Sequence, residues 1–386
     1  MATIPSIAMI PSGYKASKLY SVLPTNGDGD FTTSRASVAT RVNENGLIEE
    51  VASNVPRLDY SDGGCPSLLL EPTATNLITY SEDFNNASWV KLGAGTGTAA
   101  VITPNYAISP DGSLNASRLQ CLLNGGTTTS DQSLIYALDS SGTSQSISVY
   151  MKSNNGSNQV IFLANTFGAN DTFTVTSEWQ RFEFNHATSN HTFSVGLRGA
   201  TGSDDTADIS IWGAQSESLS YATSYIKTVG TTQTRTADTA SGSGNSTVIN
   251  SSEGVLYFEG SALANDGTNR YISLSDGSTL NRVNIFFDSS NKLRVFYNGI
   301  SGSISINIDT TINNKIAFKY KSGDSALWVN GTEVATRADS LSLVGLNLLS
   351  FDLSGGGGNI FNSKTKSVQV YTTALSDLEL TNLTKI

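Results

Sequence analysis

Few side chains in this chain have types and spacings that suit catalysis or metal binding. The two histidines, His186 and His191, are five residues apart beside a predicted hairpin, and neither has a cysteine nearby. We interpret them as solvated imidazoles, with metal ligation as the alternative. The chain has no Gly-x-Ser-x-Gly nucleophile elbow, no phosphate-binding loop and no zinc pattern. A Ser-His-Asp arrangement of residues distant in sequence stays open, but the chain shows no ready-made active-site motif.

Two tryptophans are the candidate ligand contacts. Trp179 and Trp212 lie in or beside segments in which apolar and polar residues alternate. Such positions favour burial in the core of a β-sandwich. The alternative is a sugar-stacking platform, in which an aromatic face meets the apolar face of a pyranose.

Bulk composition limits the class of partner. The 386 residues carry a formal charge of −10 with a pI near 4.7, and no lysine or arginine cluster occurs. A surface of this kind repels phosphate backbones, so we expect no nucleic-acid binding. The chain has no basic, apolar leader and no run of about 18 apolar residues. We therefore expect neither a secretory signal nor membrane insertion.

The two cysteines, Cys65 and Cys121, are too few for a disulfide framework. We interpret both as small buried hydrophobic residues. A bond between them is the alternative, and it requires Cα atoms within about 7 Å of each other.

Alternation with period two predicts an all-β protein. Ile147, Val149 and Met151 share one strand face, with Ser146, Ser148 and Tyr150 opposite, so we expect sheets with one solvated face. We predict an irregular N-terminal anchor segment followed by two antiparallel β-sandwich (jelly-roll) domains. The predicted boundaries are an anchor at 1–75, a jelly roll at 76–238, a linker at 239–252 around Ser241–Ser246, and a second sandwich at 253–386.

Short sequence motifs in the second sandwich each predict a specific local structure. Asn330 and Gly331 between apolar runs predict a type I′ hairpin. Ser376 and Glu379 have the spacing of a capping box, with Leu375 and Leu380 as a hydrophobic staple, and predict one helical turn. This strand-and-turn ending resembles that of a concanavalin A-like or laminin-G-like sandwich. The resemblance implies a module that holds ligands or partners on its loops.

Two further stretches resemble tailed-bacteriophage virion proteins that carry carbohydrate-binding-type domains. The first resembles their lead-in segment, with Ser-Arg-Ala at 34–36, Pro-Arg-Leu-Asp-Tyr at 56–60, Cys-Pro-Ser-Leu-Leu-Leu-Glu at 65–71 and Thr-Asn-Leu-Ile-Thr-Tyr-Ser-Glu-Asp-Phe at 75–84. The second is similar to the later half of their jelly roll, with Glu-Trp-Gln-Arg-Phe at 178–182, Ile-Trp-Gly-Ala-Gln at 211–215, Ala-Thr-Ser-Tyr-Ile at 222–226 and Arg-Thr-Ala-Asp at 235–238.

The resemblance implies a non-enzymatic virion structural protein, a head or tail fibre or spike that binds host surface glycans during adsorption. It implies that residues 1–75 contact other virion proteins, and that the chain is a homo-oligomer, with a trimer before a dimer. Such a protein is made in the host cytoplasm and released by lysis as part of the virion. The alternatives are a capsid decoration, cement or baseplate protein that binds only other virion proteins, and, third, a polysaccharide depolymerase.

The resemblance also suggests a site for a structural calcium. Ser109-Pro-Asp111-Gly112 resembles a loop that supplies one ligand of a structural calcium, and Asp208 resembles the other. An Asx-turn at Asp111 is the alternative, and Asp28 with Asp30 is a weaker candidate.

Concanavalin A-like glucanases place their acids as Glu-x-Asp-x-x-Glu on one strand, and no such triplet occurs here. This disfavours catalysis by that route, although an active site between subunits stays an alternative.

Overall fold

The computed structural model describes residues 3–139, 146–166, 169–186, 192–297, 303–356 and 358–386. They form two compact units, each interleaved in sequence with the other. Unit 1 comprises Met1–Glu44, Val51–Pro72 and Thr236–Ile386, and unit 2 comprises Asn45–Glu50 and Thr73–Arg235. The described residues are almost all β, with antiparallel sheets and one short helix, as the alternating pattern predicted. No helix in the described ranges is long and apolar enough to cross a membrane.

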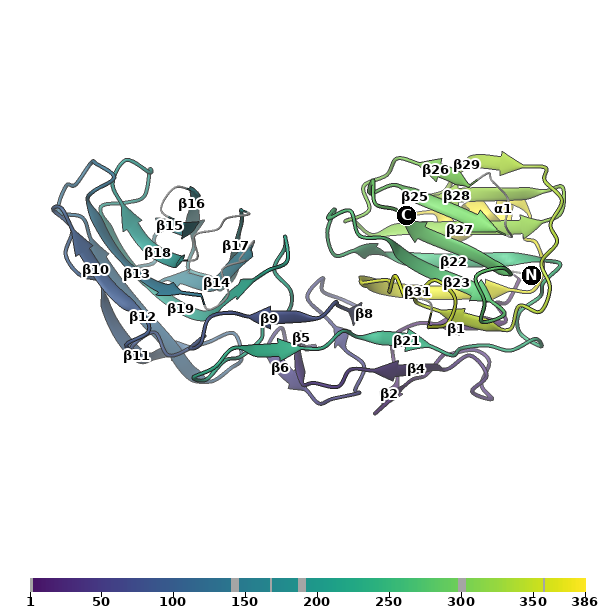
Figure 1. The fold of residues 1–386 in the computed structure, drawn as a ribbon, viewed down its shortest axis with the longest axis horizontal. Helices are drawn as coiled ribbons and strands as arrows, with labels where there is room; N and C mark the ends of the chain where they lie inside the picture. The colour runs from purple at the N-terminus through teal and green to yellow at the C-terminus, as the bar shows by residue number, and fades with distance from the viewer. Residues whose placement is uncertain (1–2, 140–145, 167–168, 187–191, 298–302, 357) are drawn as a thin grey trace. The chain divides into compact units, whose positions relative to one another are not determined.

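Unit 1 is a β-sandwich built from both ends of the chain (Figure 1). Its larger sheet, as described, has the order β29 (Thr332–Arg337), β28 (Ser325–Val329), β27 (Asn314–Lys321), β22 (Glu253–Ala262), β31 (Ser363–Tyr371), β8 (Ser67–Leu70) and β7 (Leu58–Asp59), and β1 (Ile7–Met9) also pairs with β31. The facing sheet has the order β26 (Ile304–Ile306), β25 (Leu293–Tyr297), β24 (Arg282–Phe287), β23 (Arg270–Ser275) and β30 (Leu348–Ser350).

Shorter strands complete unit 1. A small sheet has the order β2 (Tyr14–Lys15), β3 (Lys18–Leu19), β4 (Phe31–Ser34) and β21 (Thr239–Ser241). Strand β5 (Ala39–Val42) also belongs to unit 1, whereas most of β6 (Ile48–Val51) belongs to unit 2.

The N-terminal segment differs from the irregular anchor predicted for residues 1–75. It contains strands, and Ile7, Leu58 and Leu68 lie in the same buried core as Phe258 and Val283 of the sandwich. The apolar run at Leu68–Leu70 is buried throughout because β8 lies inside the sheet, between β31 and β7. The segment therefore packs into the sandwich of its own chain.

The predicted linker at 239–252 is also part of unit 1. β21 pairs with β4, and the Ser243 amide donates to the Leu349 carbonyl at 3.2 Å. The Gly- and Ser-rich composition signalled a flexible spacer, but these backbone groups are hydrogen-bonded within the sandwich, which fixes the segment.

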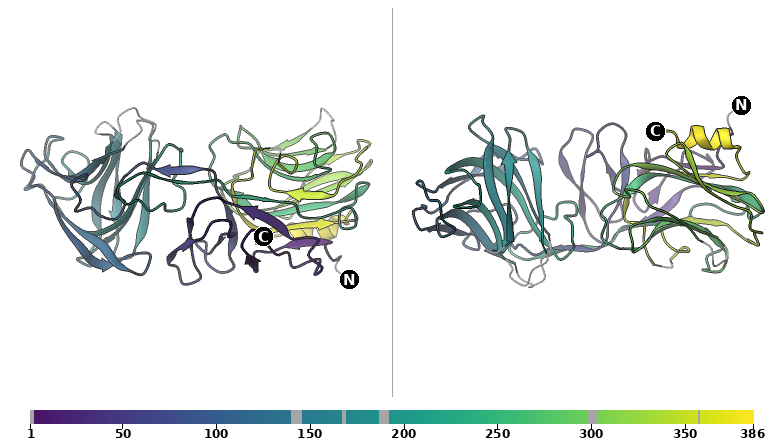
Figure 2. Two further views of the ribbon diagram at one scale, coloured as in Figure 1. Left: turned by 60° about the horizontal axis from the view of Figure 1, so that its bottom comes forward. Right: turned by 90° about the horizontal axis from the view of Figure 1, so that it is seen from above.

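The C-terminal signals are confirmed. Asn330 and Gly331 both have positive φ, 51° and 84°, as a type I′ turn between β28 and β29 requires. Helix α1 (Asp377–Thr384) begins with the predicted capping box of Ser376 and Glu379, and it runs longer than the single turn expected. Leu375 and Leu380 pack with Trp328 under this helix, which lies on the outer face of the larger sheet (Figure 2).

Unit 2 is a jelly roll of two facing sheets. One has the order β10 (Val90–Ala94), β13 (Gln132–Leu138), β18 (Thr192–Arg198), β15 (Gln159–Thr166) and β16 (Ala169–Val175) in the described residues. The other, called here the front sheet, has the order β11 (Val101–Ile108), β12 (Leu114–Leu122), β19 (Thr206–Glu217), β14 (Ser146–Ser153) and β17 (Gln180–Asn185). A separate pair joins β9 (Ala74–Asn76) to β20 (Gln233–Arg235).

The front sheet is not solvated along its whole outer face. Ile147, Val149 and Met151 point into the core, as predicted, but Ser146 and Ser148 on the other face are also buried. That end of the outer face is covered by polar and aromatic side chains of unit 2, so it holds a second buried layer. The other end of the same face remains partly open, and it carries the candidate site.

Candidate functional site

Trp212 is fully buried, at 1% exposure, as a core residue would be. It lies on the outer face of the front sheet, in a cluster with Ile48 and Tyr225, and is not part of the core between the sheets. Its ring lies 4.5 Å from that of Tyr225 and 5.6 Å from that of Tyr150, centroid to centroid. A ring enclosed in this way has no face to offer a sugar.

Trp179 is half-buried and keeps part of its ring accessible. It directly precedes β17, and its Nε1 donates to the carbonyl of Ile108, at the end of β11, at 2.9 Å. Lys152 places its Nζ 5.3 Å from the indole centroid, within the range of a cation–π contact. Of the two predicted stacking residues, Trp179 is the one whose position permits that role.

Next to Trp179, a row of polar residues crosses the open end of the front sheet. Cross-strand pairing aligns Arg118 of β12, Ser210 of β19 and Lys152 of β14 on one face. The Arg118 Nε donates to Asp208 Oδ1 at 2.8 Å, and its Nη2 donates to Asp208 Oδ2. Asn154 donates from Nδ2 to Asp208 Oδ1 at 3.0 Å, and its own Oδ1 accepts from Ser210 at 2.7 Å.

An aromatic ring lies at each end of this row. The Arg118 guanidinium lies 5.0 Å from the ring of Tyr106, which is 43% exposed, and Trp179 lies beside Lys152 at the other end. We define the front-sheet row as Tyr106, Arg118, Lys152, Asn154, Trp179 and Asp208.

The charges of the row are fixed by its central ion pair. The hydrogen bond to Asp208 raises the pKa of Arg118, and the hydrogen bond from Arg118 lowers the pKa of Asp208. Both groups are therefore ionised at neutral pH. Their side chains are 28% and 27% exposed, so the pair contributes little to stability but keeps donors and acceptors within reach of a ligand.

The structure gives Asp111 and Asp208 separate roles and no partner in common. Asp111 accepts from Ser109 Oγ at 2.6 Å and from the Ser113 amide at 2.8 Å, which is the Asx-turn alternative. Burial opposes ionisation of Asp111, but hydrogen bonds from Ser109, Ser113 and Asn115 outweigh it and lower its pKa. The cation beside Asp208 is the Arg118 guanidinium, which would repel calcium. No group of three or more His, Cys, Asp or Glu in the described residues is arranged to hold a metal.

The weaker candidates serve local structure. Asp30 pairs with Lys18 at 2.8 Å, and Asp28 accepts from Asn26 at 2.8 Å within the same turn. His186 has its ring parallel to that of Phe184, with centroids 6.2 Å apart. His191 lies outside the described residues.

The two cysteines are both free and differ in exposure. Cys121 is buried, as predicted, whereas Cys65 is exposed, contrary to prediction. Cys65 follows the turn at Gly63 and Gly64, both of which have positive φ. It therefore lies on a surface loop rather than in the core.

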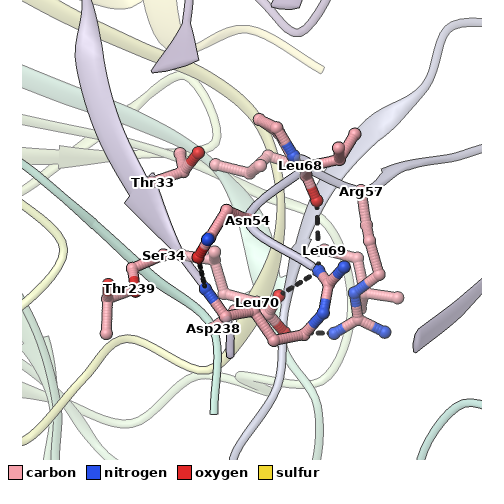
Figure 3. Close-up of a pocket in the computed structure, with 12 residues that line it drawn as sticks. Thr33, Ser34, Asn54, Arg57, Leu68, Leu69, Leu70, Asp238 and Thr239 are labelled. Atoms are coloured by element: carbon pink, nitrogen blue, oxygen red, sulfur yellow. Dashed lines mark hydrogen bonds and ion pairs between the residues drawn. The ribbon is translucent and has the colours of Figure 1, made fainter. Parts of the chain in front are cut away.

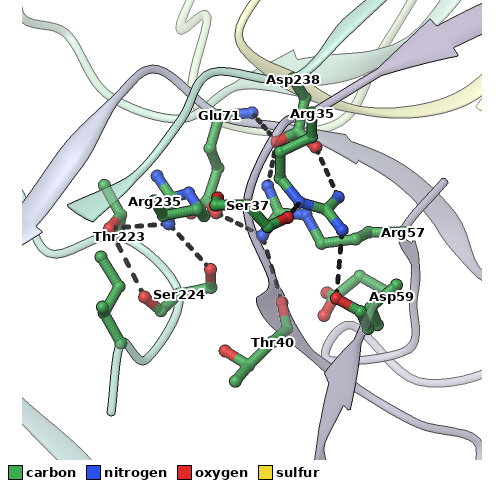
Figure 4. A network of polar contacts seen from close by, with 12 residues as sticks. Arg35, Ser37, Thr40, Arg57, Asp59, Glu71, Thr223, Ser224, Arg235 and Asp238 are labelled. Carbon is green, nitrogen blue, oxygen red and sulfur yellow. Dashed lines mark hydrogen bonds and ion pairs between the residues drawn. The ribbon is translucent and has the colours of Figure 1, made fainter. Parts of the chain in front are cut away.

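Four residues of the virion-like stretches meet in a buried ionic cluster of unit 1 (Figure 4). Asp238 accepts from Arg57 Nη2 and from Arg35 Nη1, the latter at 3.0 Å, and Glu71 accepts from Arg57 Nη1 at 2.6 Å. Burial would lower the pKa of Arg57, but the charges of Asp238 and Glu71 outweigh it and raise that pKa. These stretches thus have a structural role.

The cavity beside this cluster is too small for an organic ligand. It measures about 10 Å³, close to the room that one water molecule needs (Figure 3). Its walls come from β4, β8, β21 and the Arg57 side chain.

No family model and no curated protein matches this chain. Among solved structures, the CBM40 of Ruminococcus gnavus IT-sialidase bound to α2,3-sialyllactose is 18% identical with a TM-score of 0.32, covering 36% of this chain and 86% of that one. Domain 4 of AbnA, a GH43 extracellular arabinanase from Geobacillus stearothermophilus, in complex with arabinotriose, is 14% identical with a TM-score of 0.21, covering 82% and 100%. Trypanosoma rangeli sialidase is 8% identical with a TM-score of 0.31, covering 96% and 82%. Likenesses this distant carry no information on the ligand of this chain.

Proposed function

We propose that this protein is a non-enzymatic, glycan-binding component of a tailed-bacteriophage particle, and that the front-sheet row is its glycan site. One observation carries the proposal: hydrogen-bonding side chains lie between two partly exposed aromatic rings, Tyr106 and Trp179, on an open sheet face. The virion context is supported by the sequence stretches that resemble virion proteins.

The chemistry of the row suits a sugar. Sugar hydroxyls donate and accept hydrogen bonds, and the row offers carboxylate oxygens at Asp208, guanidinium donors at Arg118 and an amide at Asn154. The rings can cover the apolar face of a pyranose. A row on an open sheet face buries little of its ligand, so each site would bind weakly, and several copies on one particle would raise the avidity.

The electrostatics favour binding over hydrolysis. A glycosidase needs a carboxylic acid whose pKa is raised, so that it can protonate the leaving group. Arg118 has the opposite effect on Asp208 and holds its carboxylate ionised. An ionised, hydrogen-bonded carboxylate is suited to accepting protons of sugar hydroxyls in hydrogen bonds.

Virion attachment would use unit 1 as a whole. Residues 3–72 contribute β1, β7 and β8 to its larger sheet, so the N-terminal segment is not a detached anchor. We propose that exposed surfaces of unit 1 contact other virion proteins, in a trimer or dimer. Light scattering of the purified protein measures that oligomeric state.

Binding is tested with the purified full-length chain on a glycan array, followed by calorimetry with the best ligand. We expect Arg118→Ala and Asp208→Asn to weaken binding at least 10-fold. Arg198→Ala is the matched control, because Arg198 also lies over a ring, that of Phe162 at 5.9 Å, but on the opposite sheet of unit 2. Equal affinities for Arg118→Ala and wild type would refute the site.

The particle role needs a separate test. Phage that carry Arg118→Ala should assemble normally and adsorb poorly. Normal adsorption would favour the cement role, and reducing ends released from host capsule would show a depolymerase. Deletion of residues 240–386 would not separate these roles. It removes β31, the partner of β1 and β8, and would therefore disrupt the larger sheet of unit 1.

A further inference from the structure

An arginine–aromatic cluster lies on the outer face of the smaller sheet of unit 1. It consists of Tyr271 (β23), Phe286 and Arg282 (β24), and Arg294 and Phe296 (β25). Cross-strand pairing places Tyr271 opposite Phe286, and Phe286 opposite Arg294. Neighbouring residues in these strands, such as Ile272 and Ile285, point the other way into the core.

Arg282 is a half-buried cation without an anion. Its guanidinium lies 4.6 Å from the ring of Phe296, and its Nε donates to Asn284 Oδ1 at 2.7 Å. It forms no ion pair within the described residues, and the residues outside those ranges include no aspartate or glutamate. Burial lowers the pKa of Arg282, and no carboxylate opposes this effect.

Arg294 is also incompletely satisfied. Its Nε is buried and has no hydrogen-bond partner in the part of the chain that is described. Its Nη1 lies 3.5 Å from Asp288 Oδ2, which is a long ion pair, and its guanidinium lies 5.7 Å from the ring of Phe286. The Asp288 carboxylate also accepts the Ser290 and Lys292 amides through Oδ1.

Tyr271 adds a ring and a hydroxyl to the cluster. Its ring is stacked on Phe286, with centroids 4.3 Å apart and planes at 10°. Burial raises the pKa of Tyr271 and outweighs the opposing charges of Arg282 and Arg294. The cluster thus has two cations, and Asp288, 3.5 Å from Arg294, is the one carboxylate paired with them within the described residues, in a protein of net charge −10.

We propose that this arginine–aromatic cluster binds an acidic saccharide, one that carries a carboxylate or sulfate on its sugar ring. Guanidinium groups bind such planar or multi-oxygen anions with paired hydrogen bonds, and a phenol hydroxyl can add a third donor. The half-buried rings of Tyr271 and Phe296 supply apolar contact for the sugar. The site lies in a different unit from the front-sheet row and shares no residue with it. Failure of one proposal therefore leaves the other unaffected.

The test uses the full-length chain and calorimetry with three probes: tetragalacturonate, a sulfated heparin tetrasaccharide and neutral maltotetraose. We expect at least one acidic probe to bind and the neutral probe not to. Arg282→Ala and Arg294→Ala should each weaken that binding at least 10-fold. Arg282→Lys should recover part of it, because the charge remains while the planar fork is lost.

Two controls separate this site from other effects. Arg41→Ala removes another arginine over a ring in unit 1, 5.6 Å from Tyr14, and should leave binding unchanged. Arg198→Ala removes an arginine over the ring of Phe162 in unit 2, outside both proposed sites, and should also leave binding unchanged. Absence of acidic-probe binding at millimolar concentration would overturn the proposal. Full binding by folded Arg294→Ala, together with full binding by folded Arg282→Ala or Arg282→Lys, would also overturn it. The relative affinities of the two acidic probes identify which anion is preferred.

Discussion

The Arg57 guanidinium and the Asp238 carboxylate, 181 residues apart in sequence, form an ion pair inside unit 1, with side-chain exposures of 0% and 7%. Arg35 donates to the same carboxylate at 3.0 Å. A buried pair adds modest net stability, but loss of one partner leaves uncompensated charge in the interior. The pair therefore makes unit 1 sensitive to single substitutions far from any ligand site.

Asp238→Ala should lower the free energy of unfolding by about 3–5 kcal/mol, because two buried guanidinium groups lose their shared anion. Equilibrium urea unfolding measures this loss. The matched control is Asp62→Ala, which breaks the more exposed pair with Lys364 and should cost less than about 1 kcal/mol. Similar losses in the two variants would contradict the buried role of Asp238.

The two tryptophans of unit 2 should separate stability from binding. Trp212→Ala should cost about 3–5 kcal/mol of unfolding free energy, because it empties a packed site beside Tyr225. Trp179→Ala should change stability by less than about 1 kcal/mol and weaken glycan binding. Urea unfolding and calorimetry on the same preparations measure both effects. A stable Trp212→Ala variant that fails to bind would reverse the two assignments.

Acid should loosen the start of helix α1 as Glu379 is protonated. The hydrogen bond from Thr3 and those from Ser376 lower the pKa of Glu379 from 4.5 to about 2. Since the folded-state pKa is the lower one, the contribution to stability is complete above about pH 4.5 and is lost as the pH falls towards 2. The carboxyl-carbon NMR shift of Glu379 reports the midpoint. Thr3→Val removes one donor and should move the midpoint upward, and an unchanged midpoint would exclude this contact.

One thiol per native chain should react rapidly with Ellman's reagent. Cys65 is exposed, whereas burial raises the pKa of the Cys121 thiol to about 12, so its reactive thiolate is scarce. The second thiol should react only after unfolding in urea. Cys65→Ser should abolish the fast phase, and two equally fast thiols would contradict the burial of Cys121.

Local signals in the sequence predicted local structure well. The alternation at Ile147, Val149 and Met151, the turn at Asn330 and the cap at Ser376 each depend on residues a few positions apart. The strands of the N-terminal segment were missed, because they are only two to four residues long and carry little periodicity. Two of them, β1 and β8, pair with β31, which lies about 360 and about 290 residues later, and nothing in a short window predicts that pairing.

The candidate site was predicted only in part for the same reason. Trp179 was identified by residue type, but Arg118 was not, because its partner Asp208 lies 90 residues away on the neighbouring strand. Register across strands decides such contacts, and register comes from long-range pairing. The outer-face burial of Trp212 likewise depends on the distant Ile48 and Tyr225.

The pairing of β1 and β8 with β31 sets an order of events during translation. The larger sheet of unit 1 cannot close until the ribosome has released the chain through Tyr371, whereas every strand of unit 2 has emerged by Arg235. The jelly roll can therefore fold first, while the N-terminal strands β1 and β8 still lack their partner β31. Nascent chains arrested shortly before residue 363 should be the form most dependent on chaperones.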